Sequence, residues 1–439
     1  MYSENDKKSI YFHNRTDIFI FIIVIIVVIF FVGPIIIYTV SHLSPGSRQK
    51  DIFLSANCEE FFGGKTMETL ILEFNEKNPD LRVMLLNDNG EKSREPDILF
   101  FDESEFNDLA AEGTLLPFEL QPGRTSAGQW SGEVDTGVMM PAIPLVSFMD
   151  LLFFNIELLQ AAGFDRPPKT MDDFLLYAKT ISTANNGILA DAAGAAMALN
   201  PANKQSLSRD IFSWIWAAGW NFWPDGDSAP VINSKPVING LNFLGRLYRE
   251  GVLSPNNFEM TEEQALEGFA QGKIAMLIAS TRAIPGLREK MGDGAFGITT
   301  IPSAGTAGKY NVSLTGIFAG INKNCINPDA AWVFLEFLAD KSPFLCAQLK
   351  AVPGYIPELL PVDNKNYIKE DPFYSKAWDI FESSVVVPGF LGIPGAQEYE
   401  NAVREEIQPF FEGKRTAQDM VNAIQRSWDW VFSSSIPKD

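Results

Sequence analysis

The sequence contains little histidine and cysteine, the residue types on which many catalytic and metal sites depend. The two histidines among its 439 residues, His13 and His42, both lie before residue 47. Ser-His-Asp and Cys-His catalysis need an imidazole, and so do most catalytic zinc and iron sites. The chain after residue 46 has no histidine and therefore cannot form such sites. The three cysteines, Cys58, Cys325 and Cys346, are odd in number and not spaced as C-x-x-C, which argues against a disulfide framework or structural zinc and favours buried free thiols. We therefore expect no metal or cofactor, and carboxylate chemistry such as glycoside hydrolysis is the enzymatic class that stays open.

Basic residues are also few. Lys and Arg number 35 against 55 Asp and Glu, a net charge of -20, and such a protein repels phosphate backbones, so we expect no nucleic-acid partner. The length suggests two or three domains of about 150 residues each. Fractions of 46% hydrophobic and 21% charged residues are typical of globular chains.

Residues 18–40, "IFIFIIVIIVVIFFVGPIIIYTV", contain no charged side chain. As a helix this segment would measure roughly 35 Å, enough to cross a hydrocarbon layer of about 30 Å, so it predicts a transmembrane helix. No A-x-A cleavage pattern and no lipidation cysteine directly follow it. We expect an uncleaved single-pass anchor in the cell membrane, with 1–46 forming a cytoplasmic tail, anchor and linker and the remainder outside the cytoplasm. Cleavage near Ser44–Ser47 is the alternative.

Strand-like and helix-like patterns alternate after this segment. The first strands are expected at 52–56, 81–86 and 97–101, with helices at 64–78 and 103–112 between and after them. Later elements follow the same patterns: an extended stretch at 142–155, a helix that begins after Thr170, helices at 237–250 and 261–271, strands in "KIAMLIAS", "GAFGITTIP" and "SLTGIFAGI", and mainly helices from Pro328. Such alternation argues for an α/β fold with a mostly parallel sheet.

The stretch "CEEFFGGKT", residues 58–66, matches the end of the phosphate-binding pattern G-x-x-x-x-G-K-[ST] through Gly64, Lys65 and Thr66. The first glycine of that pattern is replaced by Glu59, and Glu60 follows. Two carboxylates in the loop would repel phosphate, so we interpret the stretch as an ordinary strand–loop–helix junction with Cys58 in the strand.

Polar side chains follow two of the predicted strands. Glu59 and Glu60 come after the first strand, and Asp102, Glu103 and Ser104 come after the third. Ligands of open α/β sheets bind outside the carboxyl ends of strands, so these acceptors could share one wall of a cleft. A solvated acidic rim is the alternative.

Two further side chains are candidates for solute contacts. Trp220 follows Gly219 at the end of a tryptophan-rich helix, and its flat ring suits the apolar face of a sugar; a core position is the alternative. Arg282 follows the buried strand "IAMLIAS" and could bind a hydroxyl pair or an anionic group through both guanidinium nitrogens; a surface salt bridge is the alternative.

The chain resembles a known family through five segments in the family's order: "ETLILEFNEKNPDLRV", "PDILFFDESEFNDLAAEGTLLPFE", "LLFFNIELLQAAGFDRPPKTMDDF", "EGFAQGKIAMLIAS" and "NPDAAWVFLEFLADKSP". It is similar to the extracellular solute-binding proteins of ABC importers, in the group of maltose- and glycerol-phosphate-binding proteins, from about Asp51 onward. The resemblance implies a two-lobed α/β periplasmic-binding-protein fold of class II with hinge crossings. Lobe I would comprise 47–147 and 302–352, and lobe II 148–301 and 353–439.

The resemblance also implies ligand contacts near several of the residues above. Together with the residue patterns it gives a candidate ligand-binding set: Glu59, Glu60, Phe101, Asp102, Ser104, Ser147, Phe148, Arg209, Trp220, Arg282 and Tyr355. The family's sugar-stacking tryptophans would fall at Phe101 and Arg282, which argues against maltodextrin itself. We expect another mono- or oligosaccharide, a related polyol, or a solute with a polar or acidic group.

The expected function is that of a binding protein and not an enzyme. The resemblance implies that the cleft captures a carbohydrate-like solute and that the closed form docks on the transmembrane subunits of an ABC permease. Two alternatives stay open: a membrane-anchored glycosidase that uses paired carboxylates, and a ligand-sensing lobe of a signalling system.

Overall fold

A computed structural model describes residues 49–55, 57–86, 94–116, 142–203, 208–220, 230–304, 310–351, 370–387, 390 and 395–435. The chain divides into two compact units: Met1–Asp51 with Asn78–Arg82, and Ile52–Lys77 with Val83–Asp439. Every feature of the site discussed below belongs to the second unit. Within the described ranges no helix has the length and apolar character that crossing a membrane requires. Residues 18–40 lie outside those ranges, so the membrane helix stays a prediction.

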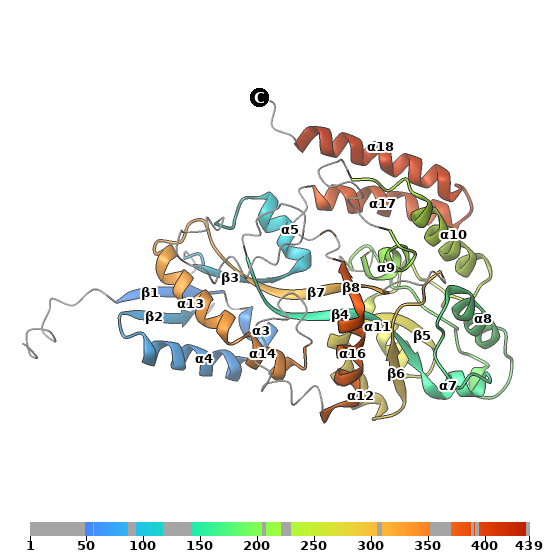
Figure 1. The fold of residues 1–439 in the computed structure, drawn as a ribbon, viewed down its shortest axis with the longest axis horizontal. Coiled ribbons are helices and arrows are strands. Elements are labelled where there is room, and N and C mark those ends of the chain that lie inside the picture. The colour runs from blue at the N-terminus through green and yellow to red at the C-terminus, as the bar shows by residue number, and fades with distance from the viewer. Residues whose placement is uncertain are drawn as a thin grey trace, which may run out of the picture. The chain divides into compact units, whose positions relative to one another are not determined.

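Eight strands form one sheet in the described part of the chain, in the order β2-β1-β3-β7-β4-β5, with β6 beside β4 and β8 beside β7 (Figure 1). Their bounds are β1 Lys50–Leu54, β2 Leu81–Leu85, β3 Ile98–Asp102, β4 Ile143–Asn155, β5 Met276–Ser280, β6 Phe296–Thr299, β7 Tyr310–Ile321 and β8 Ser384–Val387.

The pairing is mixed and not mostly parallel, which corrects the expectation from the sequence. β1 pairs with β3 and β7 with β8 in parallel, whereas β3 with β7 and β4 with β5, β6 and β7 are antiparallel. β7 enters between β3 and β4 and runs opposite to both, and β5 and β6 also run opposite to β4. A strand–helix alternation read along the sequence does not reveal a late strand inserted in this way.

The long strand β4 changes its pairing partner in the middle. Its first part pairs with β7 as far as Met149 opposite Leu314, and its second part pairs with β5 from Asp150 opposite Ser280 onward. Nearly every residue of β4 is buried, as expected for a strand covered on both faces. β4 therefore links two groups of strands through one continuous backbone.

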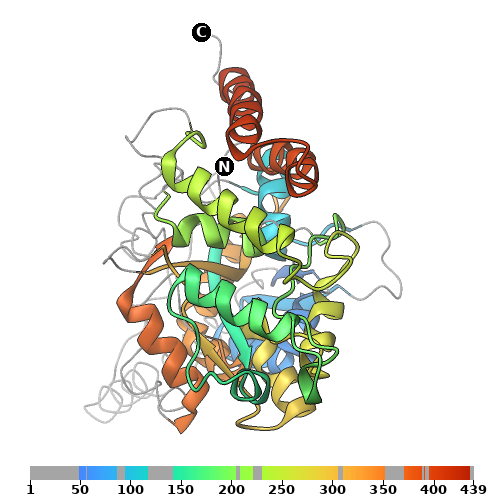
Figure 2. The same ribbon diagram turned by 90° about the vertical axis from the view of Figure 1, so that its right-hand side faces the viewer.

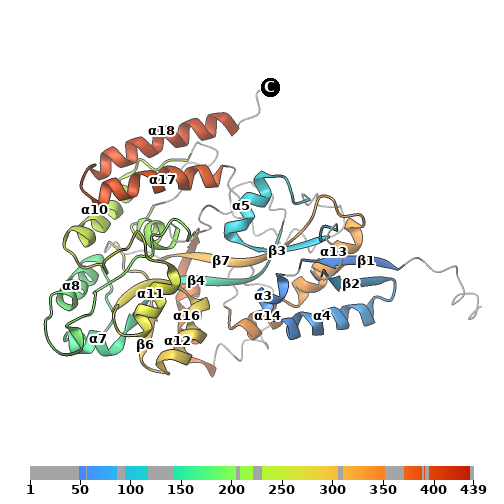
Figure 3. The ribbon, with the colours of Figure 1, turned by 180° about the vertical axis from the view of Figure 1, so that it is seen from behind.

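The helices alternate with the strands and then dominate the C-terminal part. In chain order they are α3 Cys58–Phe62, α4 Gly64–Lys77, α5 Glu103–Ala111, α7 Ile156–Ala161, α8 Met171–Ser182, η2 Gly187–Leu189, η3 Ser208–Phe212, α9 Ser213–Ala217, α10 Lys235–Arg249, α11 Glu262–Ala270, η4 Thr281–Ala283, α12 Ile284–Met291, α13 Pro328–Asp340, α14 Ser342–Leu349, α16 Pro372–Ser383, α17 Ala396–Phe411 and α18 Ala417–Ser435. α17 and α18 pack on each other and on α10, and the three views agree on this arrangement (Figures 1, 2 and 3).

Local sequence signals explain where several helices begin. The Thr170 hydroxyl accepts a hydrogen bond from the Asp173 amide at the start of α8, which is the N-cap that the sequence predicts. The Asp102 carboxylate accepts one from the Glu105 amide, 3.2 Å away, and so caps α5. α4 begins at Gly64, so Lys65 and Thr66 lie in its first turn as expected.

The segment after β1 differs from the prediction. Cys58 does not continue the strand but opens the short helix α3, and Gly63 ends that helix with a φ of 82°. A positive φ suits glycine because it has no Cβ. In the Gly-Gly pair that resembles a phosphate loop, Gly63 therefore separates two helices and Gly64 begins the second.

Aromatic side chains fill the core around β3 and α9. Phe101 stacks on Phe318 with ring centroids 6.1 Å apart, and Trp214 meets Phe174 edge to face at 4.8 Å. Rings buried in this way contribute on the order of 2 kcal/mol each through removal of apolar surface from water. This packing fixes the strand ends that carry the site.

Candidate ligand-binding site

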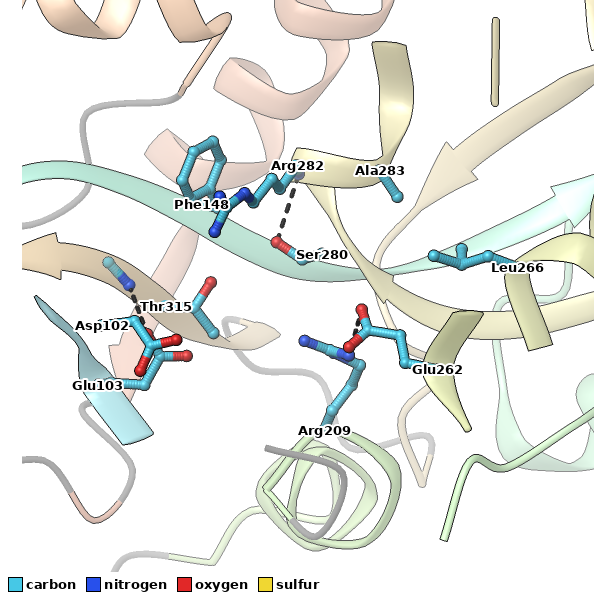
Figure 4. Close-up of a pocket in the computed structure, with 11 residues that line it drawn as sticks. Asp102, Glu103, Phe148, Arg209, Glu262, Leu266, Ser280, Arg282, Ala283 and Thr315 are labelled. Atoms are coloured by element: carbon cyan, nitrogen blue, oxygen red, sulfur yellow. Dashed lines mark hydrogen bonds and ion pairs between the residues drawn. The ribbon is translucent and has the colours of Figure 1, made fainter. Parts of the chain in front are cut away.

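A cavity of about 300 Å³ lies where segments far apart in the sequence converge. Figure 4 shows that its walls come from the end of β3, the start of α5, β4, η3, α11, the β5–η4 junction and β7. The lining residues are Asp102, Glu103, Phe148, Arg209, Glu262, Leu266, Ser280, Arg282, Ala283, Thr315 and Gly316.

Glu103 is held at the cavity by one oxygen. The Gly316 amide of β7 donates to Oε2 at 3.0 Å, while Oε1 is covered from solvent and has no hydrogen-bond partner among the described residues. Burial, and next the neighbouring Asp102 charge, raise the pKa of Glu103 to about 8, against the Gly316 amide that lowers it; Asp150 adds a smaller raising effect. The group is therefore largely protonated at neutral pH, an uncommon state for a carboxyl group on a cavity wall.

Arg209 sits on the π-helical turn η3, which presents it to the cavity from below β4 in Figure 4. Its guanidinium is buried and lies 3.2 Å from Asp150 and 2.6 Å from Glu262. Burial opposes its charge, but Asp150 and Glu262 outweigh that effect and raise the pKa of Arg209 above its usual value. These two carboxylates neutralise the positive charge of Arg209.

Asp150 is the buried anchor of this arrangement. It lies on β4 with 1% of its surface exposed, and it also accepts a hydrogen bond from the Ser313 hydroxyl at 2.8 Å. A buried carboxylate with a cation and a hydroxyl as partners avoids most of the cost of desolvation.

Asp210 follows Arg209 on the same turn but does not line the cavity. Burial raises its pKa to about 7, although Arg209 and the Ala198 amide act in the opposite direction. The turn therefore holds a second carboxyl group that titrates close to neutral pH.

Arg282 differs from Arg209 because it is exposed and forms no ion pair with any described residue. Its guanidinium carbon lies 5.8 Å from the centroid of the Phe148 ring, and Figure 4 shows the two side chains together on one side of the cavity. A guanidinium over an aromatic face is weakly held by the ring. Its N–H groups stay available to a solute.

The candidate set from the sequence is partly brought together here. Asp102, Phe148, Arg209 and Arg282 line the cavity. Ser147 lies next to Phe148 on β4 and is buried, but it is not a lining residue.

Other members of the set lie elsewhere. Phe101 is 1% exposed in the core with Phe106 and Phe318. Trp220 is 3% exposed, lies against the Phe212 ring, and donates its indole N–H to the Val231 carbonyl at 2.8 Å. Both rings are thus used in packing, and neither lines the cavity.

Glu59 and Glu60 are exposed on α3 and do not line the cavity. The helix explains this placement, because a strand continued to Cys58 would have carried both residues further along the sheet. Tyr355 and the side chain of Ser104 lie outside the described part of the chain.

Several lining residues are absent from the candidate set. Glu103, which the sequence places with Asp102 among the acceptors after a predicted strand, begins α5, and Glu262 begins α11. Ser280 ends β5 and Thr315 lies within β7, and polar residues are common at all of these places. Asp150 does not line the cavity, but it pairs with the lining residue Arg209 and had the clearest signal: it is a single charge within the apolar run "PLVSFMDLLFFN". Burying such a charge costs free energy unless a partner meets it, so the run itself indicates a buried cation nearby.

The arrangement suits the binding of a hydroxylated solute. Carboxyl groups, two guanidinium groups, two hydroxyls and a phenyl ring surround one small space, which is the mixture expected of a site that orients a polar ligand. Among the described residues, no group of three or more His, Cys, Asp or Glu side chains is placed to hold a metal ion.

Known proteins share sequence and fold with this chain. The model of the family described as bacterial extracellular solute-binding protein matches residues 63–342. A protein of Brucella abortus named as a binding protein is 22% identical over 282 residues, which are 62% of this chain and 63% of that protein. An ABC transporter-binding protein of Deinococcus radiodurans is 22% identical over 256 residues, 57% of this chain and 59% of that protein. The chain thus matches less than two thirds of the length of these curated relatives.

A solved structure extends the comparison to most of the chain. The GacH receptor of Streptomyces glaucescens, determined without ligand and with acarbose, superposes with a TM-score of 0.68 at 16% identity and covers 88% of this chain and 99% of its own. At this identity the likeness establishes the fold, which is the two-lobed α/β fold of periplasmic binding proteins. Since the family model also matches more than half of the residues, the chain belongs to the family of bacterial extracellular solute-binding proteins.

Proposed function

We propose that this protein captures a carbohydrate solute in the cavity lined by Asp102, Glu103, Phe148 and Arg282, and delivers it to the permease of an ABC importer. The observation that carries the proposal is the convergence of these side chains from separate segments around about 300 Å³ of space. Cavities of this size hold small polar ligands. The acarbose complex of GacH adds support from a protein of the same fold.

Each side chain has a defined task in this proposal. Arg282 donates to ring hydroxyls, Phe148 lies against an apolar face, and Asp102 and Glu103 accept from hydroxyl or amino groups. Arg209 keeps Glu262 and Asp150 in place and adds little net charge.

Delivery requires that the solute favours a closed form. The predicted lobes, 47–147 with 302–352 and 148–301 with 353–439, each contribute lining residues, so a solute that contacts both would stabilise their approach. We propose that residues 18–40 anchor the protein on the outer side of the cell membrane, which raises its concentration near the permease.

A binding screen tests this function. The full chain, kept in detergent because of residues 18–40, is examined by thermal shift and then by calorimetry against mono- and oligosaccharides and polyols. We expect at least one member to bind with a dissociation constant of about 10 μM or lower and to raise the melting temperature. If no saccharide or polyol of any size binds, the carbohydrate function is wrong.

A glycosidase is the second candidate, because Glu103 has the raised pKa of a general acid and Asp102 lies beside it. The two functions predict different fates for the sugar. Chromatography after prolonged incubation with the tightest oligosaccharide should return it intact; cleaved product that disappears in Glu103→Gln would favour the enzyme.

A further inference from the structure

We infer that the corner formed by Asp102 and Glu103 receives a protonated amino group of the solute, so that the preferred ligand is an amino sugar and not a neutral one. This inference rests on the proposed carbohydrate function and names its substrate class. It is carried by the unpartnered oxygen of Glu103 and by the signs of the charges around it.

The geometry leaves one strong acceptor for a ligand. The Gly316 amide fixes Glu103 through Oε2. Glu103 lines the cavity, and its Oε1 is covered from solvent without a hydrogen-bond partner among the described residues. A buried acceptor without a partner costs free energy relative to a satisfied one. A ligand that places an N–H or O–H donor here regains that free energy.

The charges decide between these donors. Figure 4 shows Asp102 and Glu103 side by side, apart from the Arg209–Glu262 pair and from Arg282, which lies with Phe148. The positive charge of Arg209 is engaged by Asp150 and Glu262. The field at Glu103 is therefore set by carboxylates and favours a positive charge or a proton.

In the free protein a proton on Glu103 compensates the negative field of the neighbouring carboxylates. The pKa of Glu103, raised to about 8 by burial, by Asp102 and more weakly by Asp150, indicates that a proton occupies the corner near pH 7. An ammonium group would replace that proton, restore the carboxylate and form charge-assisted hydrogen bonds, which are roughly twice as strong as neutral ones. A sugar hydroxyl would satisfy Oε1 without compensating the charge.

The test uses three trisaccharides that share a β-1,4-linked glucose backbone and differ only at carbon 2: the glucosamine trimer, the N-acetylglucosamine trimer and cellotriose. D-Glucosamine and D-glucose serve as the corresponding monosaccharides. Calorimetry on the full chain at about pH 6, where the sugar amine is charged in solution, should give the aminated member of a set a dissociation constant at least tenfold lower than its neutral counterparts. Measurements in two buffers with different ionisation enthalpies should show that binding releases protons.

Two variants separate the effect of the Glu103 carboxyl group from that of a nearby carboxylate outside the cavity. Glu103→Gln should reduce the preference for the amine to about twofold or less and abolish proton release. The matched control, Glu105→Gln, removes a carboxylate from an exposed position in the same first turn of α5 and should keep both.

Each failure has its own meaning. Equal or tighter binding of the neutral or acetylated sugars, or an amine preference that survives in Glu103→Gln, would overturn the inference and leave the proposed function standing. If no saccharide of either kind binds, the carbohydrate function fails, and this inference fails with it.

Discussion

Two arginines at the same cavity behave differently because their surroundings differ. Arg209 is buried and held by Asp150 and Glu262, so it is a part of the wall. Arg282 is exposed and has the Phe148 ring as its neighbour, so its N–H groups are accessible to a solute in the cavity. Residue type alone, as seen in the sequence, treats the two as equivalent.

The first prediction concerns Arg282. Arg282→Ala should weaken the tightest saccharide by about tenfold or more, since a hydrogen bond from a charged group contributes roughly 1.5–3 kcal/mol. The variant should unfold within about 0.5 kcal/mol of the wild type, because an exposed side chain is removed. Calorimetry and urea unfolding measure the two effects. The control Arg426→Ala removes an exposed arginine of α18 and should leave binding unchanged; an unaltered dissociation constant in Arg282→Ala would exclude Arg282 from the site.

The second prediction concerns Glu103 and pH. Its folded pKa of about 8 exceeds the ordinary value of 4.5, so the folded state binds the proton more tightly than the unfolded state. This contribution to stability is complete below about pH 4.5 and is lost as the pH rises toward about 8. Urea unfolding at pH 5 and pH 8 should show a loss that is smaller in Glu103→Gln than in the wild type by about 1 kcal/mol or more. An equal loss in both would mean that Glu103 is not protonated in the folded protein.

At the scale of elements, sequence patterns predict what depends on neighbours along the chain. The helical spacing of Met67, Leu70, Ile71 and Phe74 predicts α4. Met67, Leu70 and Phe74 are buried, and Ile71 is half-buried. The alternation could not predict α3, because a five-residue helix is too short to show a period. It also could not predict the antiparallel position of β7, since strand order depends on contacts distant in sequence.

The cap of α8 gives a prediction at this scale. Thr170→Ala removes the hydroxyl that accepts from the Asp173 amide and should destabilise the protein by about 1 kcal/mol. The control Thr180→Ala lies within the same helix, where the exposed hydroxyl donates to the Leu176 carbonyl, and should change stability by less than about 0.5 kcal/mol. Urea unfolding compares them, and equal effects would refute the capping role.

At the scale of the whole molecule, local sequence patterns predict one part of the candidate site, and the other part depends on contacts between distant segments. The carboxyl ends of strands predicted Asp102, and the position after β5 predicted Arg282. Glu262 and the buried Asp150 depend on how α11 and η3 approach β4, which no local pattern contains. Trp220 and Phe101 show the converse, because aromatic rings near strand and helix ends serve the core as readily as a ligand.

Closure around the solute can be measured directly. Spin labels at Glu112 and Glu289, exposed residues assigned to different lobes, should approach by more than about 2 Å when the tightest saccharide is added. Labels at Asp191 and Glu289, both assigned to lobe II, should keep their distance. Cys325→Ser removes the least buried thiol before labelling. If the first distance is constant, or if the control pair moves as much, either closure or the lobe assignment is wrong.

The strand β4 connects the cavity wall to both groups of strands. Its paired neighbour changes from β7 to β5 between Met149 and Asp150, so a rotation of one group of strands against the other would be felt at that peptide. Asp150 also accepts hydrogen bonds from the Arg209 guanidinium and the Ser313 hydroxyl. A change in the backbone angle at Asp150 would therefore move Arg209 in the cavity wall. In the same way, a solute that moves Arg209 would change the backbone angle of β4.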